Sequence, residues 1–232
     1  MFKSQILPYD VYERHRKVGE LIQTVNTVLD VGGQLNMLSF FCNAQKVTVA
    51  NVAGSQEQSD VTIKGDKLPF DTNSYQVVCA IDVLEHIPTQ ERKAFINDLL
   101  RVATDKVIMS FPLGTQKHIS SEKKLQKDLE EEGVDVTYLK EHIKYGLPNL
   151  DEVKKITNGL NSKKFFSGNI NVNKILFKFF IFDPEVKYFR KIIYFLKSVF
   201  NFISNPILYA FLSNKEYSQT TNRIYLIIEK NR

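Results

Sequence analysis

The chain has 232 residues, of which 43% are hydrophobic and 25% charged, and its net charge is +5. This is a globular composition, which excludes wholesale disorder and suggests one domain of ordinary size with room for an appendage. Cys42 and Cys79 lie in apolar runs without metal-like spacing, which fits a reducing compartment. The first 17 residues lack an apolar core flanked by a cleavage site, so we expect no secretory signal and a cytoplasmic location. The mild positive charge favours an anionic partner but does not indicate nucleic acid.

Apolar, strand-like segments alternate with segments of helical spacing along most of the chain. This alternation predicts βαβ units and a parallel sheet, in which ligands bind at the carboxyl ends of the strands. The expected helices are 9–24, 35–42 and 89–103, and the expected strands are 27–31, 46–50, 60–64, 76–81, 106–111 and 223–229.

The first expected strand ends in the motif VLDVGG, which runs from Val28 to Gly33. Glycines at this point let the backbone turn sharply and let a ligand approach where a Cβ would clash. A Gly-Gly pair also occurs in plain strand-to-helix turns, and this one does not have the GxGxxG spacing of dinucleotide enzymes.

Two longer motifs follow: GDKLPFDTNSYQVVCAIDVLEHIP from Gly65 to Pro88 and LLRVATDKVIMSFP from Leu99 to Pro112. In this order and spacing, the three motifs resemble the class I S-adenosylmethionine (SAM) methyltransferases of the type 11 group, over about residues 10–115. The terminal NRIYLIIEK resembles the last strand of that family. The resemblance implies an α/β, Rossmann-like sheet of order 3-2-1-4-5-7-6 with the last strand antiparallel. It also implies SAM as the cofactor.

The resemblance assigns a part of SAM to each motif. Asp30, Gly32 and Gly33 would lie beneath the methionine part. Asp66 would accept a hydrogen bond from the adenine amino group, with backbone contacts from Lys67 and Leu68. Asp82 and Val83 would line the cofactor beside the reacting methyl group.

The sequence departs from the family pattern at two places. Gln34 and Asn36 stand where the family has loop glycines, and Asn is the milder change because it tolerates left-handed backbone. Asn51 stands at the end of the second strand, where the family places an acid that grips both ribose hydroxyls. Losing that charge-assisted bond would weaken SAM binding by about 1–2 kcal/mol.

The acceptor side of the expected site contains two histidines that are candidates for taking a proton. His86 ends the VLEH segment, near the expected substrate mouth, and His142 lies in the segment 138–148 together with Tyr145. The latter segment resembles part of bacterial methyltransferases associated with cell-surface glycans. Histidine titrates near neutral pH, so we assign His86 and His142 as catalytic candidates, against the alternatives of an orienting hydrogen bond and a solvated turn. We place His15 on a helix surface and His118 in a loop.

The sequence therefore predicts SAM-dependent methyl transfer to an O or N atom of a small-molecule, glycan or lipid-linked acceptor. This reaction needs alignment and a proton acceptor, and we expect no metal. The alternative is a catalytically inactive protein of the same fold that acts as a membrane- or partner-binding module. A nicotinamide enzyme is disfavoured by the absent GxGxxG motif and by the non-acidic Asn51.

Residues 172–213 differ in composition from the rest of the chain. They hold nine of the 17 phenylalanines (among them Phe182) and six basic residues opposed by Asp183 and Glu185, which leaves +4 of the net charge. Apolar residues recur at helical spacing opposite Lys187, Arg190 and Lys191, a pattern typical of interfacial helices on anionic lipid. Its longest uncharged run, 198–214, contains Asn201, Asn205 and Pro206, so we expect no membrane span.

We accordingly predict a SAM-binding core of residues 1–171 completed by 221–232, with a helical insertion at 172–220. The insertion is interpreted either as a lid over the acceptor pocket or as a peripheral membrane contact, with anionic lipid at the inner face as a partner.

Overall fold

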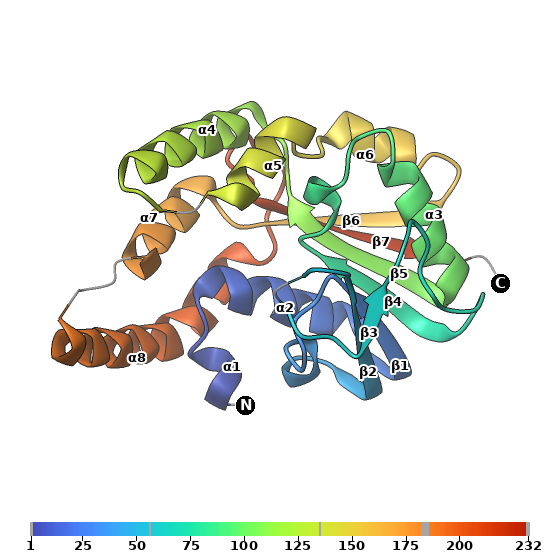
Figure 1. The fold of residues 1–232 in the computed structure, drawn as a ribbon, viewed down its shortest axis with the longest axis horizontal. Helices are drawn as coiled ribbons and strands as arrows, with labels where there is room; N and C mark the ends of the chain where they lie inside the picture. Colours follow the sequence, from blue (N-terminus) through green and yellow to red (C-terminus); the bar gives the residue numbers. More distant parts are fainter. Residues whose placement is uncertain (1, 56, 135, 182–185, 231–232) are drawn as a thin grey trace.

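A computed structural model describes residues 2–55, 57–134, 136–181 and 186–230 of the chain. Its centre is one seven-stranded sheet of order β3-β2-β1-β4-β5-β7-β6 (Figure 1). The strands are β1 (Thr24–Val31), β2 (Asn43–Val52), β3 (Val61–Ile63), β4 (Tyr75–Ile81), β5 (Ala103–Pro112), β6 (Asn161–Ser167) and β7 (Arg223–Glu229). The first five pair in parallel, whereas β7 runs antiparallel to β5 and β6, which confirms the predicted topology.

Helices cover both faces of the sheet and enclose two apolar cores. Alternate residues of β4 point to opposite faces, so that Val77 and Cys79 pack with Val18 and Ile22 of α2 (Tyr9–Ile22). Val78 belongs to the other core, which is covered by α3 (Arg92–Val102) and α6 (Leu150–Ile156). The remaining helices are α1 (Phe2–Gln5), α4 (Gln116–Glu131), α5 (Thr137–Tyr145), α7 (Ile170–Ile181) and α8 (Lys187–Leu212), with the 3₁₀ turns η1 (Leu38–Phe40) and η2 (Leu84–His86).

The helix expected at residues 35–42 was predicted wrongly. Only the turn η1 forms between β1 and β2. Its Leu38 is fully buried in the core beside α2. A Cβ at Gly19 of α2 would collide with the Phe41 carbonyl, so the chain after η1 runs directly against α2 and space for a full helix is lost.

Two helices, α7 and α8, lie between β6 and β7 in the region where we expected an insertion at 172–220, and they have different surroundings. Helix α7 lies beside α4 and α5, whereas α8 extends along α1 and α2 (Figure 1). Three of the residues that we used in defining the insertion, Phe182, Asp183 and Glu185, lie outside the described residues.

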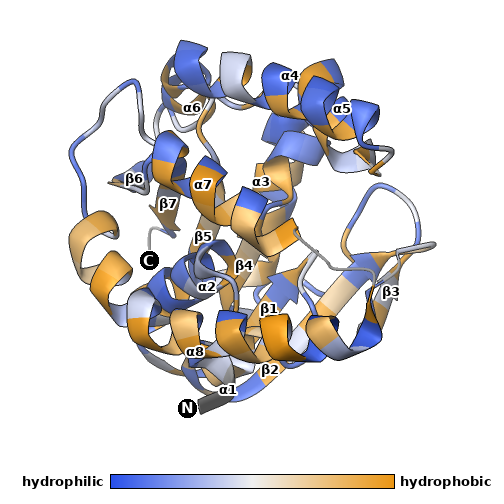
Figure 2. Cartoon of the chain, turned by 90° about the vertical axis from the view of Figure 1, so that its left-hand side faces the viewer, coloured by the Kyte–Doolittle hydropathy of each residue, from blue (hydrophilic) through white to orange (hydrophobic). Residues whose placement is uncertain are grey.

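Helix α8 has a polar buried face and an apolar exposed face. Asn201 donates to the Ile6 carbonyl at 2.9 Å, Asn205 donates to the Gln5 and Leu7 carbonyls, and Lys197 donates to the Phe180 carbonyl. These three side chains are buried, whereas the apolar stripe predicted from the sequence is exposed, including Phe189, Leu196, Phe200 and Ile203. Figure 2 colours much of α8 as hydrophobic. Among the described residues, α8 alone has the length and apolar composition needed to cross a membrane. We expected no membrane span because the uncharged run 198–214 is too short and polar. The observed helix has 26 residues and is longer than that run, because it also includes the charged residues at its start.

Candidate active site

A pocket of about 420 Å³ opens where the carboxyl ends of β4 and β5 meet the first residue of β7. Because β7 is antiparallel, its Arg223 reaches the same edge as Asp82, which follows β4. Helices α2, α4, α5 and α7 supply the remaining walls. Charged and polar residues line the pocket together with apolar and aromatic ones such as Tyr9, Tyr138 and Phe177, and most of the lining surface is apolar.

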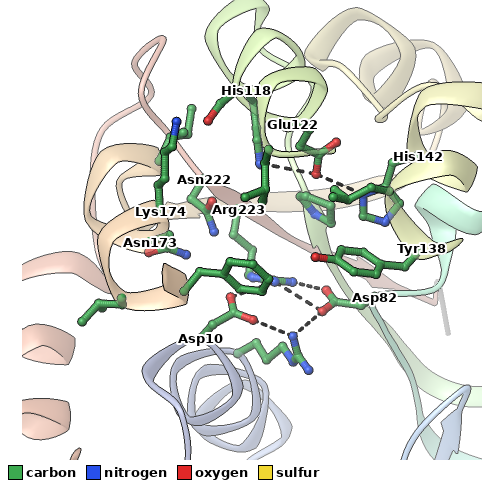
Figure 3. A pocket seen from close by; sticks show the side chains of 18 of the residues that line it. Asp10, Asp82, His118, Glu122, Tyr138, His142, Asn173, Lys174, Asn222 and Arg223 are labelled. Atoms are coloured by element: carbon green, nitrogen blue, oxygen red, sulfur yellow. Dashed lines mark hydrogen bonds and ion pairs between the residues drawn. The ribbon is translucent and has the colours of Figure 1, made fainter. Parts of the chain in front are cut away.

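A network of charged groups forms the floor of this pocket (Figure 3). Arg223 is 4% exposed and pairs with Asp82 and, at 3.3 Å, with Asp10. Arg14 bridges the same two acids at 2.6 and 2.7 Å. Burial alone would raise the pKa of Asp82, but Arg14 and Arg223 outweigh it and lower that pKa to about 2. Asp82 is therefore expected to stay ionised near neutral pH. Its backbone has a positive φ of 54°, and its side chain pairs with both arginines.

A second polar cluster contains both catalytic candidates. His86 lies in η2 and His142 in α5, and their ring centroids are 4.9 Å apart. Glu141 contacts Nδ1 of His86 at 2.7 Å, and Glu122 contacts Nδ1 of His142 at 3.0 Å. The structure thus brings together two residues 56 positions apart, in a wall of the pocket. Tyr145, which shares the segment 138–148 with His142, does not line the pocket.

Several residues of this site could not be recognised from the sequence. Glu85 is 1% exposed, and burial raises its pKa well above the usual range, with the charge of Asp82 adding to the effect. His118 is a buried residue of α4 that lines the pocket, and His15 is buried as well, so the loop and surface placements were wrong. Burial lowers the pKa of both histidines, to about 4 for His15. The one sequence signal for Glu85 was its position in the DVLEH motif, directly before the candidate His86.

Of the residues expected to hold the cofactor, Asp82 is the one that lines this pocket; the others lie at the ends of β1, β2 and β4 and in the connection between β3 and β4. Asp30 is fully buried, and neither carboxylate oxygen has a hydrogen-bond partner among the described residues. Burial raises its pKa to about 7. A Cβ on Gly33 would collide with this carboxylate, and one on Gly32, whose φ is +78°, would collide with Val83. Because these two residues are glycines, the side chains of Asp30 and Val83 can pack directly against the loop. Asp30 remains an acceptor without a hydrogen-bond partner among the described residues.

Three other predicted cofactor positions have local roles. Asn51 is buried, and its amide donates to the Gly33 carbonyl at 2.8 Å, so the side chain ties β2 to the glycine loop. Asp66 and Lys67 are exposed in the connection between β3 and β4. The backbone N–H of Leu68 donates to Asp98 at 2.6 Å, so this amide already has an acceptor within the protein.

This sheet, with its single antiparallel strand and its helices on both faces, is the fold of the class I SAM-dependent methyltransferases. A solved SAM-dependent methyltransferase from Archaeoglobus fulgidus is 12% identical, with 96% of this chain and 94% of that chain covered and a TM-score of 0.56. The plantazolicin methyltransferase BamL, solved with a triazolic desmethylPZN analog and SAH, is 14% identical over 99% of this chain and 86% of its own, with a TM-score of 0.53. The plantazolicin methyltransferase BpumL, solved with SAH, is 14% identical over 97% of this chain and 85% of its own, with a TM-score of 0.52. No protein-family model and no curated protein matches the sequence.

Proposed function

We propose that the protein is a SAM-dependent methyltransferase of the type 11 kind, acting on an O or N atom of a small-molecule, glycan or lipid-linked acceptor. The observation that carries the proposal is the unpaired Asp30 carboxylate beneath the glycine loop. SAM has a cationic α-ammonium group, which is the partner that a buried carboxylate lacks. The SAH held by BamL and BpumL, which share the fold, supports the same cofactor.

SAM, when bound, supplies a methyl group activated by a sulfonium. The chain must hold the acceptor in line with that methyl group, exclude water and take the acceptor's proton. The pocket beside Asp82 has the volume and apolar lining for the first two tasks. His86 and His142, each held at Nδ1 by a glutamate, are the proposed proton acceptors through Nε2.

SAM binding should depend on Asp66. Isothermal titration of the wild-type chain should show SAM affinity on the order of micromolar, and Asp66→Ala should weaken it by about 1–3 kcal/mol, because the adenine amino group loses its acceptor. Asp71→Ala is the control, since Asp71 is an exposed acid of the same connection. Equal SAM affinity in the two variants would remove Asp66 from the site, and absence of SAM binding in the wild type would reject the proposed function.

We also propose that α8 contacts an anionic membrane surface. Its exposed apolar side chains are unusually large and numerous for a surface helix: Tyr188, Phe189, Ile192, Tyr194, Phe195, Leu196, Val199, Phe200, Phe202, Ile203, Ile207 and Phe211. Lys187 and Lys191 are exposed at its first turns and would meet lipid phosphates. Because Asn201 and Asn205 fix the opposite face to the chain before α2, this arrangement suits a helix lying on the membrane.

The membrane proposal predicts binding to anionic vesicles that salt weakens. The protein should co-sediment with anionic but not neutral vesicles at low salt, and Lys187→Glu with Lys191→Glu should reduce the bound fraction several-fold. The control is Lys123→Glu with Lys124→Glu, which makes the same charge change on exposed positions of α4, across the molecule from α8 (Figure 1). Protein that stays in the supernatant with both vesicle types would overturn the membrane contact.

A further inference from the structure

Three side chains in one wall of the pocket offer metal-ligand atoms close together. Glu85 and His86 come from η2 and His142 from α5, and one ligand atom of each lies within 4.8 Å of the others. All three residues line the pocket. Arg92 holds the two elements together, because it donates to the Leu84 carbonyl of η2, to the carbonyl of Ile87 directly after η2, and to the Tyr145 carbonyl at the end of α5.

Both histidines are oriented as metal ligands usually are. Their Nδ1 atoms contact Glu141 and Glu122, which leaves Nε2 of each ring as the nitrogen without a hydrogen-bond partner among the described residues. A carboxylate behind the ligating ring is the common outer partner of a metal-bound histidine, since it fixes the tautomer and the ring direction. The glutamates therefore preset both rings for coordination through Nε2.

Two of the ligand groups lack the partners that their burial demands. Nε2 of His142 and Oε2 of Glu85 are buried, and neither has a hydrogen-bond partner in the described parts of the chain. His142 is 7% exposed and Glu85 is 1% exposed. Unpaired polar atoms at such depth are costly, and one cation between them would satisfy both.

We propose that Glu85, His86 and His142 bind a divalent first-row transition metal ion, with Zn²⁺ as the best match. Two imidazoles and one carboxylate form a donor set that Zn²⁺ and non-haem Fe²⁺ use in catalytic sites, where further positions stay open for water or substrate. Metal–ligand bonds of roughly 2.1 Å place ligand atoms about 3–3.5 Å apart, so small side-chain rotations would close the site. The open positions would face the pocket.

The binding of the ion is independent of the proposed function, whereas its role rests on that function. An acceptor hydroxyl bound to the ion would lose its proton to water more readily, since a bound cation lowers the pKa of an oxygen ligand. The oxygen would then form its bond to the methyl carbon of SAM as the carbon–sulfur bond breaks, and the sulfur would leave as the neutral thioether of S-adenosylhomocysteine. In that state His86 and His142 serve as ligands, and they take the proton themselves only in metal-free protein.

The test is metal binding by the full chain after treatment with a chelator and dialysis. Titration with Zn²⁺ should show one site per chain, and Co²⁺ at the same site should give visible d–d absorption of an N/O-coordinated ion. His142→Ala and Glu85→Gln should each weaken binding at least tenfold. Glu122→Gln, which removes only an outer partner, should weaken it by about 10–100-fold.

The matched control is His15→Gln, because His15 is buried outside the pocket lining and should leave the Zn²⁺ stoichiometry unchanged. Thermal melts of the metal-free variants show which of them are folded. If His142→Ala does not fold, Glu122→Gln still tests the site. Absence of Zn²⁺ binding in the wild type, or equal affinity in the wild type and the folded variants, would overturn the site. SAM affinity measured on the same samples separates the two proposals: SAM binding without Zn²⁺ binding rejects only the metal site, and the reverse rejects only the methyltransferase.

Discussion

Replacing Arg92 by Met is expected to lower the free energy of unfolding by about 3–5 kcal/mol, because breaking a buried ion pair leaves its partner uncompensated. The Arg92 side chain is fully buried, and Nη1 pairs with Glu152 at 2.8 and 3.0 Å. Its other nitrogens donate to backbone carbonyls of Leu84, Ile87, Tyr145 and Gly146. Methionine retains the apolar stem but removes these donors, so carbonyls in two loops lose their partners at once.

Urea denaturation monitored by circular dichroism measures this loss. Lys93→Met is the matched control, since Lys93 is the exposed neighbour on α3 and should change stability by no more than about 0.5 kcal/mol. A loss below about 1 kcal/mol in Arg92→Met would show that solvent can replace the guanidinium. Because Arg92 joins η2 to the end of α5, a folded variant should also have weaker Zn²⁺ binding at Glu85, His86 and His142.

The sheet was predictable because its signals are local or belong to recognisable motifs. Strands such as β4 are short apolar runs bounded by polar residues, and the order of the strands followed from the motif resemblance and not from periodicity. The helix expected at 35–42 was wrong because the apolar spacing of this segment fits a helix as well as it fits the observed turn. The close contact between Gly19 and Phe41, which leaves no room for a helix, depends on tertiary packing and is not visible in the sequence.

The candidate site was predictable only where a motif carried it. Asp30, Asp82 and His86 stand at strand ends, so their convergence on one edge followed from the fold class. The pairing of His86 with His142 across 56 positions, and the depth of Glu85 behind them, depend on how α5 docks against η2. The amphipathic pattern of α8 was recognised from the sequence. An amphipathic helix usually buries its apolar face, but in α8 Asn201 and Asn205 donate to backbone carbonyls, so the polar face is buried and the apolar face is exposed.

Asp30→Asn is expected to change the pH dependence of stability by about 4 kcal/mol. Burial raises the pKa of Asp30 from 3.8 to about 7. Between these values the folded chain keeps a proton that the unfolded chain has released, so wild-type stability should fall as the pH rises from about 4 to about 7. Asparagine does not titrate, and the stability difference between variant and wild type should therefore grow in favour of the variant by about 1.4 kcal/mol per pH unit over that range.

Urea midpoints of both proteins at pH 4 and pH 8 give this double difference, in which the other titrating groups cancel. Asp71→Asn, an exposed acid, should show no such change. A constant difference between Asp30→Asn and wild type would mean that Asp30 is ionised throughout and has a compensating partner.

The same carboxylate links stability to the proposed cofactor. The α-ammonium of SAM favours the ionised form of Asp30, so binding below pH 7 requires release of the Asp30 proton. Wild-type SAM affinity should therefore rise by up to about tenfold per pH unit as the pH approaches 7 and then level off. Asp30→Asn should bind SAM more weakly and without this pH dependence. An unchanged pH profile in the variant would remove the Asp30 carboxylate from the cofactor site, even if the variant proves more stable at pH 8.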